Sequence, residues 1–459
     1  MQKKKETIGK FLEEIRISNL ALAAGLTDFV SVTDYMHLTH EKDGMRIWTQ
    51  AFQKALDEHR VMMIPSSEEP YYIDAPVRIP SNRHIEAAFD AVIRLCPETR
   101  LLMLRNENTM DGTHMPFGNE FRNVNISING GRWEESNTSR KGYGATGMYD
   151  EERSFFGVST CMLFNNIENL TLTNMVFAKT AAFAVQVGNA KNVVMENIRF
   201  ESCFADGLHI NGNVENVLVR NISGETGDDL VAINTYDWQN SSINFGPGKC
   251  MLIENITSFA TGKYKSMRLE QGIYRYDDGT EVDCSLTDAV IKGVKGVHTF
   301  KMYFQTPRYT LGTAPEYGAA GSMSGIFFED IEIDLIAPVD AKFDTYTKSD
   351  PVRGWFGAFE MGNNIDYVSF ENIRLTLYPE KYPLSRFAVV GPKSVVVDGR
   401  EVFDPYISNT VECIVLKDIF INGEKLTKWQ DAIHITEFDN VDEDGCSTGK
   451  GTLKQVVME

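Results

Sequence analysis

The stretch NVVMENIRF, residues 192–200, decides the fold that the sequence predicts. It is a short β-rich run that ends at Asn197 and continues with an apolar residue. The same pattern occurs as NLTLTNMVF before it and as NVLVRNIS after it, so that Asn174, Asn197 and Asn221 recur at intervals of 23 and 24 residues. A period in the twenties indicates a solenoid, in which each repeat stacks on its neighbours and buries a continuous core.

Later copies of this pattern are spaced more widely, at intervals of 33 to 42 residues as far as Asn372, which indicates coils that carry loop insertions. Each run alternates with period two, whereas an α-solenoid would need helical periodicity. Asparagine and aspartate tolerate turn conformations, so we call these residues the anchors of the repeat. The sequence therefore predicts an all-β fold, a parallel β-helix. The later anchors are Asn255, Asp288, Asp330, Asn372 and Asp418.

The solenoid is expected to occupy residues 30–423, between a helical segment at 1–29 and a polar C-terminal tail at 424–459. The helical segment is predicted to be a short amphipathic helix, because Ile8, Phe11 and Leu12 fall at helical spacing. The solenoid should begin with a strand in FVSVTDY, a helix in DGMRIWTQAFQKALDEH and two short strands in VMMIPSSEEPYYIDAPVRIPSN. The apolar face of that helix would contain Ile47, Trp48, Ala51, Phe52, Ala55 and Leu56.

The composition of the 459 residues limits the partners that we expect. A formal net charge of −19 argues against nucleic acid and anionic membranes, although a local basic patch could still bind an acidic substrate. The seven scattered cysteines show no metal-binding spacing and are predicted to be reduced thiols. Glu13, Glu14 and Arg16 interrupt the N-terminal apolar run, so we expect no signal peptide and a cytoplasmic protein. No cofactor or metal is predicted, and the oligomeric state is left open.

Three aspartates are candidates for catalysis. Asp228 and Asp229 precede an apolar run in GDDLVAINTYDW, and Asp206 lies 22 residues earlier in SCFADGLHI, which is close to one turn of the local repeat. We therefore expect the three carboxylates to stack on one face, where like charges raise the pKa of at least one of them and make a general acid. Arg268, one coil later, could bind a substrate oxygen or a carboxylate. The alternative is that Asp228 and Asp229 only cap a turn.

Several nearby side chains could contact a substrate. His209 could point inward as a core histidine or outward toward the cleft. Further substrate-binding candidates are Glu270, Lys265, Tyr264 and Trp238. Aromatic rings here, including Tyr236 and Tyr274, could stack on sugar rings or could be packed loop residues.

At ADGLHI and GDDLVAIN the chain resembles the polygalacturonase-like glycoside hydrolases of family 28, which are right-handed parallel β-helices. The resemblance covers about residues 30–377. It implies that Asp228 is the general acid, and that Asp206 and Asp229 hold and activate the attacking water in an inverting displacement. MRLE takes the place of the family's RIK motif, so that Arg268 matches its arginine.

The chain departs from this family in the groups expected to recognise the sugar. Phe204 and Ala205 stand where the family has Asn and Thr, His209 stands where a second acid is common, and no GHG motif follows. Glu270 replaces a lysine that in the family helps to bind the substrate carboxylate, and a glutamate would repel a uronate. The resemblance thus implies a hydrolase of oligo- or polysaccharide with altered specificity, for a neutral sugar or a uronate held differently. Exo action on an imported oligosaccharide is expected.

Two other functions remain open from the sequence. In a polysaccharide lyase on the same scaffold, the acids would bind Ca²⁺ and a basic residue such as Arg268 or Lys265 would abstract a proton. In a non-catalytic carbohydrate-binding β-helix, the aspartates would contribute to affinity at most.

Overall fold

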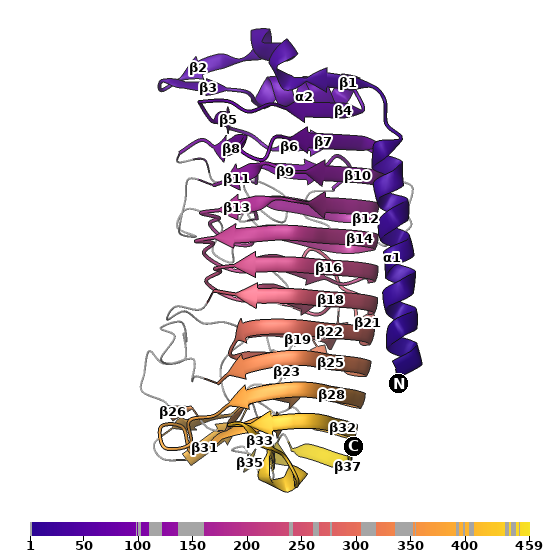
Figure 1. Ribbon diagram of the computed structural model, residues 1–459, viewed down its shortest axis with the longest axis vertical. Coiled ribbons are helices and arrows are strands. Elements are labelled where there is room, and N and C mark those ends of the chain that lie inside the picture. Colours follow the sequence, from indigo (N-terminus) through magenta and orange to yellow (C-terminus); the bar gives the residue numbers. More distant parts are fainter. Residues whose placement is uncertain are drawn as a thin grey trace. The chain divides into compact units, whose positions relative to one another are not determined.

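The computed structural model describes residues 2–97, 99, 102–109, 122–135, 160–237, 242–259, 266–275, 278–303, 318–335, 352–353, 355–391, 394–397, 400–403, 408–436, 440–441, 447–448 and 450–459. The chain divides into two compact units. The first consists of Met1–Gly227 with Asn240–Asn244, and the second of Asp228–Gln239 with Phe245–Glu459. Each unit is a stack of parallel coils, which confirms the predicted parallel β-helix (Figure 1).

The coils of the first unit form three rows of parallel strands. The first row contains β1 (Phe29–Ser31), β4 (Val61–Ile64), β7 (Arg83–Ala87), β10 (Asn123–Asn129), β12 (Met162–Thr173), β14 (Val185–Glu201) and β16 (Val214–Gly224). The second contains β3 (Met45–Ile47), β5 (Tyr71–Ile73), β8 (Val92–Leu95), β11 (Arg132–Glu134), β13 (Val176–Ala178) and the end of β14. The third contains β6 (Val77–Ile79), β9 (Leu104–Asn106), the first residues of β12 and β14, and β15 (Leu208–Asn211).

The second unit continues the same design. One row contains β18 (Gly248–Ser258), β22 (Leu286–Val297), β25 (Ser322–Asp334), β28 (Asn364–Thr376), β32 (Asn409–Ile421) and β37 (Gly451–Met458). Another contains β17 (Val231–Asn234), β19 (Ser266–Glu270), β23 (Thr299–Tyr303), β27 (Phe356–Gly362), β29 (Ser385–Val390) and β34 (Ile433–Ile435). Antiparallel strands join β20 (Gly272–Arg275) to β21 (Glu281–Cys284) and β24 (Gly318–Ala320).

The predicted anchors all adopt the left-handed conformation that the coil corners require. Asn174, Asn197 and Asn221 have φ values of 56°, 56° and 55°, and the five later anchors have φ between 52° and 61°. This region is costly for most residues but accessible to asparagine and aspartate. The side chains also join the coils, since Asn197 Nδ2 donates to Asn174 Oδ1 at 2.9 Å and Asn221 Nδ2 donates to Asn197 Oδ1 at 2.9 Å. The repeat read from the sequence is therefore confirmed.

A second asparagine ladder runs along another corner of the first unit. Asn169 Nδ2 donates to Asn125 Oδ1 at 2.8 Å, and Asn192 Nδ2 donates to Asn169 Oδ1 at 2.9 Å. Inside the second unit, phenylalanine rings pack against one another, some stacked and others tilted or edge-on, with centroids 4.4 to 5.3 Å apart. The asparagine ladders thus hold the register of the strands at the corners of the first unit. The packed phenylalanine rings hold it in the core of the second unit. The packed rings are those of Phe300, Phe328, Phe359, Phe370 and Phe387.

The N-terminal helix α1 (Gln2–Ala24) is longer than the short helix that we predicted, at 23 residues. It lies against β10, β12, β14 and β16 (Figure 1). Leu12 is fully buried, but Phe11, which we placed on the same face, is 44% exposed. Polar contacts add to this docking, since Asn19 Nδ2 donates to the backbone oxygen of Asn192 at 2.9 Å. Among the residues that the structure describes, no helix combines the length and apolar composition needed to cross a membrane.

The lead-in differs from the prediction in three places. The strand expected over FVSVTDY ends at Ser31, because the Ser31 hydroxyl accepts a hydrogen bond from the Thr33 amide and starts the 3₁₀ helix Val32–Leu38. The helix α2 (Thr49–Glu58) begins after Ile47, which lies in β3 and forms a hairpin with β2 (His40–Lys42). The region that follows forms three strands, β4, β5 and β6, rather than two.

Residues 424–459, which we expected to be a polar tail, contain strands of the second unit. β37 pairs with β32 and β34 pairs with β29, both in parallel. The ring of His434 in β34 stacks on Trp355 with centroids 3.9 Å apart, and the Arg386 guanidinium lies 4.4 Å from the centre of the Trp355 ring. The tail interpretation is wrong for these strands. The acidic stretch DNVDEDG between them made the region look polar in the sequence.

Replacing Asn169 by alanine tests the contribution of a corner asparagine. Asn169 has φ of 60° and uses its amide for two ladder bonds. Alanine loses both bonds, at about 1 kcal/mol each, and adds about 1–2 kcal/mol of left-handed backbone cost. Asn169→Gly loses only the bonds, so denaturant titration should place it between wild type and Asn169→Ala. Equal stability of Asn169→Ala and Asn169→Gly would contradict the predicted free-energy cost of alanine in the left-handed conformation.

His434 should make the second unit less stable in mild acid. Burial, assisted by the nearby Arg386 charge, lowers the pKa of His434 to about 4. Because this value lies below that of an unfolded histidine, about 6.5, stability is lost as the pH falls from about 6.5 towards 4. His434→Phe keeps the stacked ring and removes the titration. The unfolding midpoint of this variant should therefore change less between pH 7 and pH 4.5 than that of wild type, and an unchanged pH dependence would refute the assignment.

Candidate functional site

The two adjacent aspartates lie in a turn that leads into β17. Gly227 precedes them, and a β-carbon at this position would overlap the backbone oxygen of Phe204, so only glycine fits. The Asp228 side chain is 21% exposed, whereas that of Asp229 is fully buried. The two neighbours thus occupy different environments. Of this pair, only Asp228 can meet a substrate without rearrangement.

Arg268 in β19 joins the carboxylates of the second unit into one cluster. Its Nε lies 2.9 Å from Asp229 Oδ2, and its terminal nitrogens lie 3.6 Å from Asp228 Oδ1 and 3.6 Å from Glu270 Oε2. The Ser266 hydroxyl donates a hydrogen bond to the other oxygen of Asp229. We call Asp228, Asp229, Arg268 and Glu270 the arginine cluster. It places one cation among three acids.

The parallel register explains how these side chains meet. Ala232 in β17 pairs with Arg268 in β19, and Asn234 pairs with Glu270. Arg268 and Glu270 are two residues apart in one strand, so their side chains leave the same face of the sheet. Glu270 is fully buried beside Arg268. Its charge therefore belongs to an ion-pair network rather than to a surface that faces the substrate.

Asp206 in the first unit has a separate set of partners. Its Oδ2 lies 2.6 Å from His209 Nδ1, and the His209 ring stacks on Phe183 with centroids 3.9 Å apart. Asn211 Nδ2 lies 3.3 Å from His209 Nε2, while Asn211 Oδ1 accepts from Gln186 at 2.8 Å. A carboxylate accepts and an amide nitrogen donates, so this network fits neutral His209 with its proton on Nδ1. His209 is buried beside Asp206, on the opposite face of β15 from Leu208 and Ile210. Its role in substrate binding stays a prediction.

The remaining candidates have different outcomes. Trp238, Tyr264 and Lys265 lie outside the described residues, and their role stays a prediction. Tyr236 and Tyr274 are buried in a cluster with Phe245 and Cys284, so they are packed residues rather than sugar platforms. Asp206 belongs to the first unit while Asp228 and Asp229 begin the second, and their stacking on one face stays a prediction from the repeat spacing.

Two residues near the cluster were not among the candidates predicted from the sequence. Ser266 orients Asp229, and Lys301 in β23 is the register partner of Arg268. Lys301 is buried and is itself paired in register with Glu360, which is also buried. A lysine inside the apolar run TFKMYF is an unusual core residue and could have been noticed. The anchors alone did not place it on the row of Arg268, because insertions of unequal length separate the coils.

In the arginine cluster, the positive charge beside the carboxylates comes from Arg268. Both oxygens of Asp229 already have partners, one in the Ser266 hydroxyl and one in the Arg268 guanidinium. Calcium prefers several carboxylate and carbonyl oxygens in its coordination shell. The three aspartates Asp206, Asp228 and Asp229 could together hold a metal ion, so the calcium-dependent lyase remains an alternative to the hydrolase.

Comparison with known proteins supports the predicted relationship. The family model described as "Glycosyl hydrolases family 28" matches residues 123–266, a segment that includes Asp206, Asp228 and Asp229. The resemblance predicted from the sequence is therefore confirmed over this segment. A comparison with curated proteins gives no match.

Solved structures share the fold at low sequence identity. A family 28 exopolygalacturonase of Yersinia enterocolitica is 13% identical, with 94% of this chain and 78% of that chain covered and a TM-score of 0.47. A hyperthermoactive exopolygalacturonase from Thermotoga maritima is 12% identical, with 90% and 97% covered and a TM-score of 0.50. A tailspike protein of E. coli bacteriophage HK620 is 11% identical, with 87% and 63% covered and a TM-score of 0.50. At these identities the two matches with a TM-score of 0.50 show the β-helix fold alone.

Replacing Arg268 by methionine should destabilise the second unit, because Asp229 and Glu270 would lose the cation beside them. Removing one partner from a buried ion pair typically costs about 3–5 kcal/mol. Arg275→Met is a matched control, since Arg275 pairs with Glu281 at 2.6 Å on the surface, where such pairs contribute little. Denaturant titration of both variants measures the difference. Equal, small losses would show that the cluster does not depend on Arg268.

Proposed function

We propose that the protein is a glycoside hydrolase that acts with inversion and uses Asp228 as its general acid. The observation that carries this proposal is the asymmetry of the arginine cluster, in which Asp228 is partly exposed and Asp229 is buried and held by Arg268 and Ser266. The family match over residues 123–266 supports it, because that segment contains all three predicted catalytic acids.

The environment of Asp228 suits a group that delivers a proton. Three carboxylates surround Arg268, so the cluster has an excess of negative charge. A proton on one carboxylate reduces the repulsion among them. Asp228 is the exposed member, and from there the proton can pass to the glycosidic oxygen of a bound sugar. The leaving group then departs as a neutral alcohol.

The attacking water needs a base that stays ionised and fixed in position. Asp229 fits this role because Arg268 and Ser266 hold its two oxygens and stabilise the carboxylate. Asp206 is similarly oriented by His209 in the first unit. In the proposed reaction Asp229 and Asp206 orient the water and accept its proton while it attacks the anomeric carbon. The product then has the opposite anomeric configuration.

Local charge favours a neutral sugar at this position. Arg268 is surrounded by three acids, and the neighbouring cation Lys301 has Glu360 as its register partner. A uronate carboxylate would therefore meet an excess of negative charge. We accordingly propose a neutral oligosaccharide as substrate, in preference to the uronate of pectin-type substrates. Exo action stays a prediction, which the sizes of the first products would test.

Asp228→Asn should abolish hydrolysis while leaving the fold intact, since the amide cannot donate a carboxylic proton. The assay uses a panel of neutral and uronic oligosaccharides, and NMR reads the anomer of the fresh product. Asp366→Asn is a matched control, because Asp366 is an exposed aspartate in β28 of the same unit. We expect an inverted reducing sugar from wild type and from Asp366→Asn, with Asp228→Asn slower by at least about a hundredfold.

Each other result points to a different function. A retained anomer would exclude the inverting mechanism, and an unsaturated product would identify a lyase. Faster turnover of uronic than of neutral substrates would show that the excess of acids does not decide the specificity. Sugar binding that is unaffected by Asp228→Asn, without turnover of any substrate, would support a binding module.

A further inference from the structure

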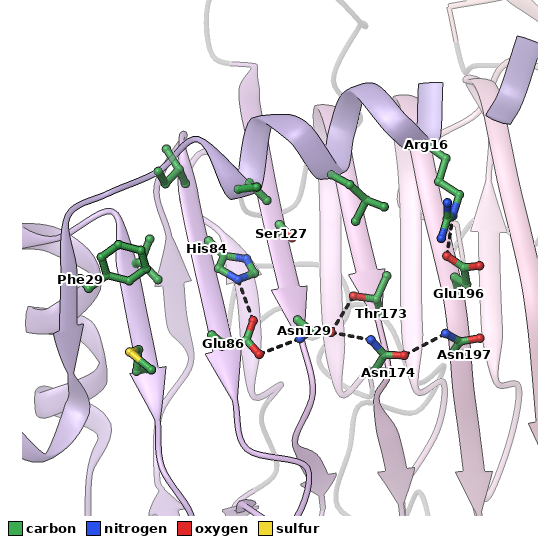
Figure 2. Close-up of a pocket in the computed structure, with 16 residues that line it drawn as sticks. Arg16, Phe29, His84, Glu86, Ser127, Asn129, Thr173, Asn174, Glu196 and Asn197 are labelled. Atoms are coloured by element: carbon green, nitrogen blue, oxygen red, sulfur yellow. Dashed lines mark hydrogen bonds and ion pairs between the residues drawn. The ribbon is translucent and has the colours of Figure 1, made fainter. Parts of the chain in front are cut away.

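We propose that the first unit has a second carbohydrate-binding site, which takes a neutral mono- or disaccharide in a cavity beneath α1. The cavity lies between the C-terminal half of α1 and the outer face of β4, β7, β10, β12 and β14 (Figure 2). All the residues that line it belong to the first unit, and none is a candidate catalytic residue. The site is therefore independent of the proposed hydrolytic reaction.

The cavity lies where the side chains of α1 become small. Leu12 and Asn19 are buried against the strands, whereas Ala23 and Ala24 line the cavity and are too small to fill it. The resulting space is about 430 Å³. Pockets that bind small molecules range from about 300 to 1,000 Å³. The space suits one or two sugar rings.

The register of the strands gives the cavity an apolar end and a polar end. Phe29 in β1 pairs with Val61 in β4, and Met63 follows in the same strand. Val61 and Met63 are in turn paired with His84 and Glu86 in β7. From β7 onward the lining is polar, with Ser127, Asn129, Thr173 and Glu196 in the successive strands. Leu20 and Leu26 extend the apolar surface on the side of α1.

A chain of hydrogen bonds crosses the polar end (Figure 2). Asn129 Nδ2 donates to Glu86 Oε1 at 2.7 Å, Asn174 Nδ2 donates to Asn129 Oδ1 at 2.7 Å, and Asn197 Nδ2 donates to Asn174 Oδ1 at 2.9 Å. Each primary amide has two hydrogens, and the ladder uses one of them. The ladder thus presents a fixed series of amide groups that can donate to the hydroxyl oxygens of a ligand.

His84 provides an independent sign that a ligand completes this site. Its Nε2 lies 3.0 Å from Glu86 Oε2, and its side chain is only 14% exposed. Its Nδ1 is buried and makes no hydrogen bond within the described part of the chain. A buried polar atom without a hydrogen bond costs free energy. A ligand hydroxyl recovers this cost once the His84 ring turns its Nδ1 toward the cavity. Figure 2 shows His84 between the sheet and α1, at the edge of the polar end.

The charges around the cavity favour a neutral ligand. Arg16 Nε lies 2.7 Å from Glu196 Oε2, and Arg220 lies 3.7 Å from the other oxygen of Glu196. Glu86 has His84 as its partner. The lining thus holds two carboxylates and a single arginine, already paired, so an anion would find no available cation. The hydroxyl groups of a sugar can bond to the amides and carboxylates, and its C–H face can pack on Phe29 and Met63. A purely apolar ligand would leave the polar end without hydrogen bonds.

Binding is tested with Asp228→Asn protein, full length, so that no probe is consumed at the proposed catalytic site. The probes are neutral mono- and disaccharides and uronic acids of matched size, and calorimetry or ligand-observed NMR gives the affinity. Ala24→Trp fills the cavity, whereas Ala21→Trp is a matched control, because Ala21 is exposed on α1 and does not line it. His84→Phe keeps the ring and removes the nitrogens.

At least one neutral saccharide should bind, with its affinity reduced about tenfold or more by Ala24→Trp and by His84→Phe and unchanged by Ala21→Trp. Uronic acids of the same size should bind more weakly. Absence of any saccharide binding that is sensitive to Ala24→Trp would overturn the proposal, as would equal binding of uronic and neutral sugars. In otherwise wild-type protein, Ala24→Trp should leave turnover unchanged, so that failure of this site and failure of the hydrolase proposal are separable.

Discussion

The left-handed corner residue, with its side chain bonded to the same residue one coil away, is the constraint on which the rest of the structure depends. A parallel strand pair alone allows slippage, because its backbone hydrogen bonds repeat along the strand. A corner that only asparagine, aspartate or glycine adopts cheaply removes this freedom. In the first unit Asn174, Asn197 and Asn221 occupy such corners and bond to one another, and in the second unit Asn372 donates to Asp330 at 2.6 Å.

Because the register is fixed, residues that are far apart in the sequence lie side by side on neighbouring strands. Arg268 faces Ala232 on one side and Lys301 on the other, although these residues are more than thirty positions away from it along the chain. The same rule places Glu86, Asn129, Thr173 and Glu196 in one row on the outer face of the first unit. Rows of polar groups are therefore the natural ligand-binding elements of this fold. What each row can bind depends on its charges and on what covers it.

The parts that the sequence predicted correctly are those set by local backbone chemistry. All eight anchors were identified because asparagine and aspartate tolerate the left-handed region better than most residues, and that preference is visible without any neighbour. Arg268 was placed near Asp228 and Asp229 because its segment lies one coil later in the repeat, and the pairing of Ala232 with Arg268 agrees with this. The aspartate pair was recognised because a buried charge needs a partner.

The parts that the sequence did not predict depend on packing between coils. The burial of Glu270 and the position of Lys301 are consequences of what lies above and below them, and insertions hid that register. The burial of His209 depends on Phe183, in the segment before β14, and on Asn211 in its own strand. The strands after residue 424 were missed because a terminal coil needs apolar residues on its inner side only.

Arg268 links stability to the proposed chemistry. A buried cluster with more acids than bases is unfavourable unless one acid keeps a proton or meets water, and Asp228 is the member with access to solvent. In the proposed reaction this solvent-accessible acid is the proton donor. A second cation in the cluster would relieve the repulsion among the three carboxylates. In the proposed reaction, the single arginine among three carboxylates holds the buried Asp229 in place and leaves Asp228 as the acid that can meet a substrate.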